Sequence, residues 1–94
     1  MSQDPNPPPV VLPIDGVLDL HTFQPREIGS LVSDYLDECR LRGILQVRII
    51  HGKGIGNLQR SVHAILSKRT DLVRFSLARA SFGGRGATIV TLKP

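Results

Sequence analysis

The chain has 94 residues, enough for one domain, and 40% of them are hydrophobic. This composition is not that of a disordered chain, and no stretch reaches the roughly 18 apolar residues that a membrane helix needs. No basic start followed by an apolar segment is present, so we expect no secretory signal. Cys39 is the single cysteine, which argues against an intramolecular disulfide and a cysteine-based zinc site. We therefore expect a cytoplasmic protein that does not enter membranes.

The net charge of +4 is unevenly distributed. Up to Glu38 the chain has seven acidic residues and a single basic one, Arg26, whereas from Arg40 onward it has eleven basic residues and one acidic one, Asp71. A basic half of this kind attracts polyanions, of which nucleic acid is the most common. The alternative is a surface that only keeps the protein in solution.

The first elements follow a proline-rich segment. Residues 1–13 hold five of the seven prolines and predict a flexible tail, so the domain itself is expected at 14–94. Residues 17–21 alternate in polarity after Gly16, which predicts a strand. A helix is expected to begin near Pro25 and to end at Gly43. Its apolar face has the three-and-four spacing of a helix and comprises Ile28, Leu31, Val32, Tyr35, Leu36 and Cys39.

The second half predicts three more strands and one helix. Strands are expected at 46–50, 73–77 and 87–92, and a helix capped by Asn57 is expected between the first two of these. The order βαβαββ predicts an α/β two-layer sandwich, with a four-stranded mixed sheet and both helices on one face.

Side chains alternate along a strand, so the open face of the sheet is also predictable. It should carry Asp19, His21, Arg48 and Arg74, which suits a platform that holds phosphates beside an acid–base pair. The side chains expected to face the helices are Leu18, Leu20, Val47, Ile49, Val73, Phe75 and Leu77. The last strand allows either parity, and the one with Val90 and Leu92 inward fits best.

Asp19 and His21 are the first candidates for chemistry. Two residues apart on a strand, they should project from one face about 6 to 7 Å apart along it. The carboxylate can then orient the imidazole, whose ordinary pKa of about 6.5 suits proton transfer in phosphodiester cleavage. The alternative is structural: Asp19 caps a turn or pairs with an arginine, and His21 only ends a strand.

Residues 51–56 form a glycine-rich loop between a strand and a helix. Three glycines let the backbone approach a ligand closely, and the helix start together with Lys53 can bind an anion. The spacing fits neither the P-loop nor the dinucleotide fingerprint. Strand parity directs His51 toward the helices, so we interpret it as shaping the loop. The alternative is a tight turn with Lys53 in solvent.

Two further features are less specific. Residues 83–86 place Arg85 in a glycine-rich turn, which contacts a nucleic-acid backbone or is only a hairpin turn. His63 is expected to be solvated near the edge of the second helix.

Taken together, three segments resemble the small MutS-related (Smr) domain family. Residues 17–21 are similar to its L-D-L-H-G motif, residues 47–58 to its strand followed by H-G-K-G-x-G-x-L, and residues 83–90 to its closing G-G-x-G-x-T-x-V segment. The resemblance, to the C-terminal domain of MutS2 and to free-standing bacterial proteins, covers roughly residues 17–92. It implies a βαβαββ fold and the nicking of DNA or the cleavage of RNA, in some members on ribosomes.

The resemblance also implies roles for particular residues. Asp19 and His21 become the catalytic candidates. The nucleic-acid-binding loop becomes His51, Gly52, Lys53, Gly54 and Gly56, and we add Arg48, Arg60 and Arg85 as candidate phosphate contacts. Two positions depart from the family pattern: Thr22 replaces a glycine, and Gln59 replaces an arginine found in many members.

The leading hypothesis is therefore an Smr-type endonuclease that acts on DNA or RNA by acid–base chemistry. A loosely bound divalent cation such as magnesium is compatible with it, and no other cofactor is expected. The alternatives are a non-catalytic module that binds DNA, RNA or ribosomes, and a protein-interaction domain. The sequence leaves the oligomeric state open.

Overall fold

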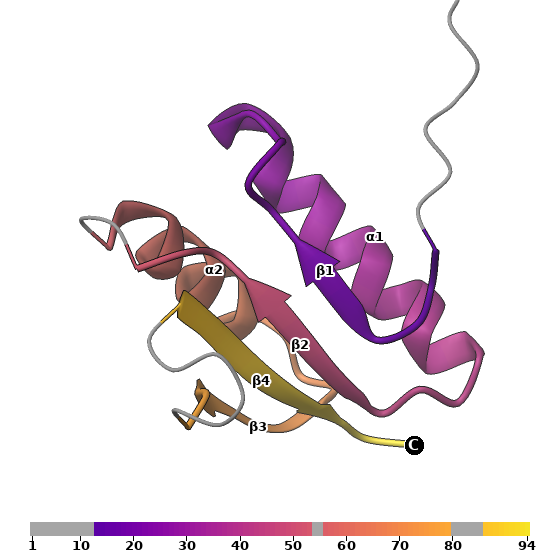
Figure 1. The fold of residues 1–94 in the computed structure, drawn as a ribbon. Helices are drawn as coiled ribbons and strands as arrows, with labels where there is room; N and C mark the ends of the chain where they lie inside the picture. Colours follow the sequence, from indigo (N-terminus) through magenta and orange to yellow (C-terminus); the bar gives the residue numbers. More distant parts are fainter. Residues whose placement is uncertain (1–12, 54–55, 80–85) are drawn as a thin grey trace, which may run out of the picture.

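The structure is a computed structural model that describes residues 13–53, 56–79 and 86–94. Most of the predicted tail, Gly54 and Arg85 therefore lie outside the described residues. The predicted βαβαββ order is confirmed (Figure 1). The elements are β1 Val17–Asp19, the short 3-10 helix η1 Pro25–Glu27, α1 Ile28–Leu41, β2 Gln46–Ile50, α2 Asn57–Ser67, β3 Leu72–Leu77 and β4 Ala87–Leu92.

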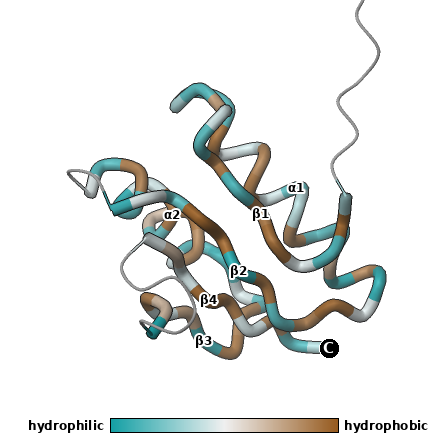
Figure 2. The backbone as a smooth tube through the Cα atoms, in the orientation of Figure 1, coloured by the Kyte–Doolittle hydropathy of each residue, from teal (hydrophilic) through white to brown (hydrophobic). Residues whose placement is uncertain are grey.

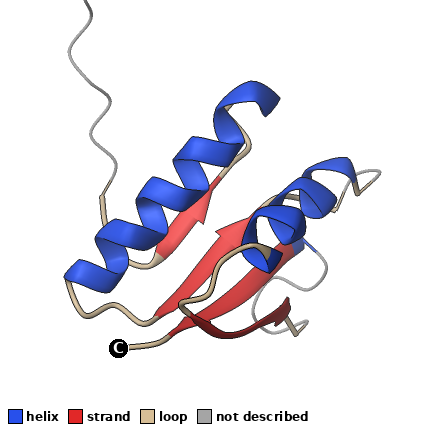
Figure 3. Cartoon of the chain, turned by 180° about the vertical axis from the view of Figure 1, so that it is seen from behind, coloured by secondary structure: helices blue, strands red, loops and turns tan. Residues whose placement is uncertain are grey.

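The four strands form one mixed sheet in the order β1-β2-β4-β3. β1 and β2 are parallel, whereas β4 is antiparallel to both of its neighbours. Both helices cover the same face of the sheet, and no described helix covers the other (Figure 1, Figure 3). The predicted α/β two-layer sandwich is confirmed, and the helix-free face is referred to below as the open face.

The predicted ends of α1 are close to the observed ones. Pro25 opens η1, which leads directly into α1. Gly43 has a φ of +75°, a left-handed conformation that glycine adopts without steric cost. This turn lets the Ile44 amide donate to the Cys39 carbonyl at 2.8 Å and so ends the helix.

Tyr35 connects α1 to the start of β1. Its hydroxyl group accepts a hydrogen bond from the Gly16 amide and donates one to the Val17 carbonyl, both at 3.1 Å. Burial of the ring raises the pKa of Tyr35, so the hydroxyl remains a donor. The predicted place of Tyr35 on the apolar helix face is confirmed.

The core lies between the helices and the sheet. Hydrophobic stretches alternate with polar ones along the chain in Figure 2, as expected where each element buries one side. The buried cluster consists of Leu18, Leu20, Ile28, Val32, Tyr35, Leu36, Cys39, Val47, Ile49, Val62, Leu66, Val90 and Leu92. Every strand residue in this cluster was predicted to face the helices.

One core prediction is wrong. Val73 is 55% exposed, because the pairing of β3 with β4 shifts between Leu72 and Arg74. This irregularity inserts an extra residue into β3 and reverses the parity of Val73. Leu72 packs against the core in its place, and Phe75 keeps its predicted position.

Arg69 joins the turn after α2 to α1. Its guanidinium makes two contacts with the Asp71 carboxylate, at 2.6 and 2.8 Å, and one with Asp37 at 2.7 Å. Arg69 holds the pKa of Asp71 below its ordinary value.

Among the described residues, no helix is long and apolar enough to cross a membrane.

Candidate functional site

The Asp19–His21 pair lies where β1 ends and the chain turns. The strand stops at Asp19, two residues earlier than predicted, and the Phe23 amide donates to the Leu20 carbonyl at 3.0 Å. These contacts place His21 and Thr22 at the centre of a tight turn. Thr22 does not have a positive φ, so this turn does not require the glycine that the family pattern has there.

The turn brings the two side chains into contact. His21 Nδ1 lies 2.8 Å from Asp19 Oδ1, and the His21 amide donates to the same oxygen at 3.0 Å. The backbone hydrogen bond and then the imidazole hold the pKa of Asp19 below its ordinary value. An ionised carboxylate only accepts hydrogen bonds, so Nδ1 carries a proton and Nε2 of the neutral ring is free to accept one.

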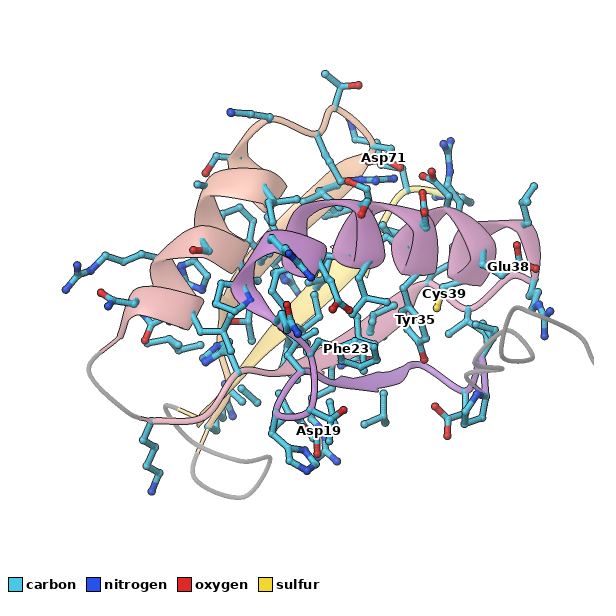
Figure 4. The ribbon with its side chains drawn as sticks, turned by 90° about the horizontal axis from the view of Figure 1, so that it is seen from above. Asp19, Phe23, Tyr35, Glu38, Cys39 and Asp71 are labelled. Carbon is cyan, nitrogen blue, oxygen red and sulfur yellow. The ribbon has the colours of Figure 1, made fainter. Side chains whose placement is uncertain are left out.

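Both side chains of the pair are accessible. The His21 side chain is 75% exposed and that of Asp19 46%. Figure 4 shows Asp19 on the side of β1 away from α1, as strand parity predicted. Beside the pair lies a hollow of about 300 Å³, whose walls include Val17, Thr22 and Phe23.

The glycine-rich loop begins at the same edge of the sheet. Asp19 pairs with Ile50 across the parallel strands, and the Leu20 amide donates to the Ile50 carbonyl at 2.9 Å. The carboxyl ends of β1 and β2 therefore lie side by side. His21 follows the first strand and residues 51–53 follow the second.

Gly86 brings the closing motif to this loop. Its carbonyl accepts hydrogen bonds from the His51 and Gly52 amides, both at 2.9 Å. A Cβ placed on Gly86 would lie only 3.6 Å from Cγ of Lys53. Residues of two motifs that lie 34 and 35 positions apart in the sequence therefore meet, and these two amides are already occupied.

The start of α2 differs from the prediction. Gly56, with a φ of +85°, occupies the N-cap position, and no side chain caps the helix. The prediction that Asn57 caps α2 is therefore wrong. Asn57 is instead the first helical residue, and its carboxamide oxygen accepts from Nη1 of Arg60 at 3.4 Å.

His51 is buried on the helix side of the sheet, as predicted. Nδ1 lies 3.0 Å from the Gly52 carbonyl and Nε2 lies 2.8 Å from the Thr88 hydroxyl. A carbonyl only accepts, so Nδ1 is the donor to Gly52. The imidazole therefore connects the Gly52 carbonyl of the loop to the Thr88 hydroxyl of β4.

His63 was expected in solvent, and this expectation is wrong. Its Nε2 lies 2.8 Å from the same Thr88 hydroxyl, and its ring packs edge-on against Phe75. Desolvation, and then the nearby His51, lowers the pKa of His63. The signal available in the sequence was Thr88, which shares strand parity with Val90 and so had to find a buried partner.

The basic candidates lie in different surroundings. Lys53 is exposed at the loop, and Arg60 is exposed on the first turn of α2. Arg48 lies on the open face, where its Nε is buried and has no hydrogen-bond partner among the described residues. Within the described part of the chain, no group of three His, Cys, Asp or Glu side chains has the arrangement of a metal site.

Comparison with known proteins agrees with this architecture. The Smr domain model matches residues 18–93. The chain is 39% identical over 80 residues to the endonuclease MutS2 of Halothermothrix orenii and 38% identical over 76 residues to that of Latilactobacillus sakei. These matches cover 85% and 81% of this chain but only 10% of each relative. The chain thus spans about a tenth of the length of these curated relatives.

Two solved structures share the fold. The Smr domain of Thermus thermophilus MutS2 superposes with a TM-score of 0.78 at 32% identity, covering 83% of this chain and 98% of that one. YdaL, a stand-alone small MutS-related protein from Escherichia coli, gives 0.77 at 30% identity, covering 87% and 67%. Sequence and structure together assign this chain to the Smr domain family.

Proposed function

We propose that this chain binds nucleic acid and cleaves a phosphodiester bond by acid–base catalysis. The observation that carries the proposal is the 2.8 Å contact between Asp19 Oδ1 and His21 Nδ1. It orients the imidazole of an exposed side chain and leaves Nε2 available to transfer a proton. His21 is the proposed catalytic base and Asp19 the residue that positions it.

On RNA, the proposed step uses the 2′-hydroxyl as the nucleophile. His21 Nε2 takes the hydroxyl proton, a bond forms between O2′ and phosphorus, and the bond from phosphorus to the 5′ oxygen breaks. The leaving oxygen takes a proton from water, and His21 returns its own to solvent. The products are a 2′,3′-cyclic phosphate and a 5′-hydroxyl. On DNA, water would replace the 2′-hydroxyl as the nucleophile.

In this proposal, the basic groups around this end of the sheet bind the phosphate that is cleaved. Lys53 follows β2 at the edge where His21 follows β1, and Arg48 lies on the open face. Positive groups placed where charge develops stabilise the transition state. The loop residues His51, Gly52 and Gly56 shape this site, and Arg60 supplies a further cation at the start of α2.

A second candidate function is binding without cleavage. The observation that favours it is Gln59, which stands where many family members have an arginine. Arg60, one position later, contacts Asn57 instead. The MutS2 relatives are named endonucleases, but this chain matches only a tenth of their length. The ribosome is a proposed partner under either function, and a cytoplasmic location remains a prediction.

The test is end analysis after incubation with labelled single-stranded RNA and supercoiled DNA, with and without a chelator. We expect cyclic phosphate ends that form in the chelator and fall at least about 100-fold in His21→Asn. Asp19→Asn should lower cleavage with little change in binding. Asp34→Asn, at an exposed position on α1, is the matched control. Unchanged cleavage in both site variants would exclude the mechanism, binding without any product would favour the second function, and loss of product in the chelator alone would show a metal requirement.

A further inference from the structure

A groove crosses the open face at β3 and β4, away from the Asp19–His21 pair. Its volume is about 500 Å³. Strand pairing places Gln46, Thr91 and Arg74 in one row across it, and Ile89 and Ser76 in the next. Arg79, two residues after the end of β3, lines the same groove. Five of these lining residues bear polar or charged side chains.

The arginines of the open face differ in their salt bridges from the arginines near the helix ends. Arg40, Arg42 and Arg69 each form a salt bridge with a carboxylate. Among the described residues, no carboxylate lies within salt-bridge distance of Arg74 or Arg79.

Arg48 adds an unsatisfied donor to the same face. Its Nε is buried and meets no acceptor in the described part of the chain, although buried donors are normally paired. Arg48 sits in one row with Ile89 and Ser76, so it lies between the groove and β1. Three cations without described carboxylate partners therefore favour an anionic ligand on this face.

The open face is wide enough for a single nucleic-acid strand to lie across it. β1 and β3 are the outer strands of the sheet, as Figure 1 shows. Three strand spacings of roughly 4.8 Å separate them by about 14 Å. A diagonal line over the sheet from the end of β1 passes near Arg48 and reaches Arg74. A flexible single strand can follow this line, whereas a duplex is stiff over such a length and presents a convex surface.

We infer that the open face binds a single-stranded polynucleotide through its backbone, with Arg74 and Arg79 holding phosphates on the far side of the sheet from the one at His21. The described aromatic side chains Phe23, Tyr35 and Phe75 all pack against the core. The described part of this face therefore offers contacts to the backbone and not to bases, and binding through the backbone should depend little on sequence. The inference rests on the proposed nucleic-acid binding but not on cleavage.

The test compares two double variants that remove equal charge. Arg74→Gln with Arg79→Gln changes the groove, and Arg26→Gln with Lys68→Gln changes exposed cations on η1 and after α2. The probes are labelled oligodeoxyuridylates of about 4 and about 16 nucleotides, which lack a 2′-hydroxyl and span the site sizes common among single-strand binders. Fluorescence anisotropy gives Kd at several salt concentrations.

We expect the groove variant to bind the long strand about tenfold more weakly and to lower the slope of log K against log salt by about 1.4. The short strand, and both strands with the control variant, should change less than about twofold. Equal weakening in the two double variants, or an unchanged Kd for the long strand, would overturn the inference. So would a duplex that binds more tightly and depends equally on Arg74 and Arg79.

Cleavage is scored separately on RNA of the longer length. If His21→Asn leaves cleavage intact while the groove variant still weakens binding, the catalytic proposal fails and the groove stands. If cleavage requires His21 but the groove variant binds normally, only the groove fails. Circular dichroism at matched concentrations checks that the variants are folded, which is expected because Arg74 and Arg79 are exposed.

Discussion

His51 and His63 share one hydroxyl group, each with its Nε2 atom 2.8 Å from Oγ1 of Thr88. His51 donates from Nδ1 to Gly52, so in its neutral form Nε2 accepts from the Thr88 hydroxyl. The hydroxyl oxygen in turn accepts from Nε2 of His63. This series of hydrogen bonds runs from α2 through β4 to the glycine-rich loop, and it is fully satisfied when both rings are neutral.

The first prediction concerns acid stability. The pKa of His63 is lowered in the folded state, by desolvation and then by His51, from an ordinary value of 6.5. Below that value the unfolded chain binds more protons than the folded one, so stability falls as the pH drops from 7.5 toward 5.5. In His63→Gln, whose amide still donates to Thr88, this fall should be smaller. Urea unfolding at both pH values measures it, and an equal fall in the variant would contradict the prediction.

The second prediction concerns the loss of the hydroxyl group that His51 and His63 share. Thr88→Val keeps the shape of the side chain but leaves two ring nitrogens without their partner. We expect a loss of about 1 to 3 kcal/mol in the free energy of unfolding. Thr91→Val is the matched control on the same strand, because Thr91 faces the groove and should change stability by less than about 0.5 kcal/mol. Similar losses in the two variants would show that the hydroxyl of Thr88 has no special role.

The third prediction separates loop binding from general charge. Lys53→Gln should weaken binding to all single strands alike and lower the salt slope by about 0.7, the value for one phosphate contact. Lys68→Gln, which removes an equal charge from the end of α2, should leave the slope nearly unchanged. Anisotropy titrations on strands of different sequence provide the measurement. A loss confined to one sequence would point to base recognition instead.

Much of this fold follows from local patterns. The spacing of Ile28, Val32 and Leu36 identifies α1, and strand parity places Leu18 inward and Asp19 outward. The short contact between Asp19 and His21 was only partly predictable. The residues and their common face follow from a strand, but the turn that folds the imidazole back onto the carboxylate depends on backbone geometry after β1.

Other features depend on contacts between distant segments. Val73 was expected inside, and it is exposed because β3 pairs with β4 through an irregularity that β3 alone does not reveal. The helical pattern alone places His63 at the surface of α2, because the sequence of α2 does not show that Thr88 lies within hydrogen-bond distance of its ring. Partners of this kind are 25 residues apart in sequence and meet only through tertiary packing.

The last prediction compares two glycines that share a backbone conformation but not their surroundings. Gly16 has a φ of +92° and Gly43 one of +75°, and both values are costly for a residue with a Cβ. A Cβ on Gly43 would meet nothing within 4 Å, so Gly43→Ala should cost only the backbone strain of about 1 kcal/mol.

A Cβ on Gly16 would lie 3.2 Å from both the Gln46 carbonyl oxygen and Cγ2 of Ile44. Gly16→Ala therefore adds crowding to the same strain, and it acts where the Gly16 carbonyl accepts from the Arg48 amide at 2.7 Å. We expect it to be the more destabilising variant by at least about 1 kcal/mol. Thermal and urea unfolding of the two variants decide the matter. Equal losses would mean that the chain relieves the contact by moving β1, and in that case the pairing that sets His21 beside the loop is less rigid than its hydrogen bonds indicate.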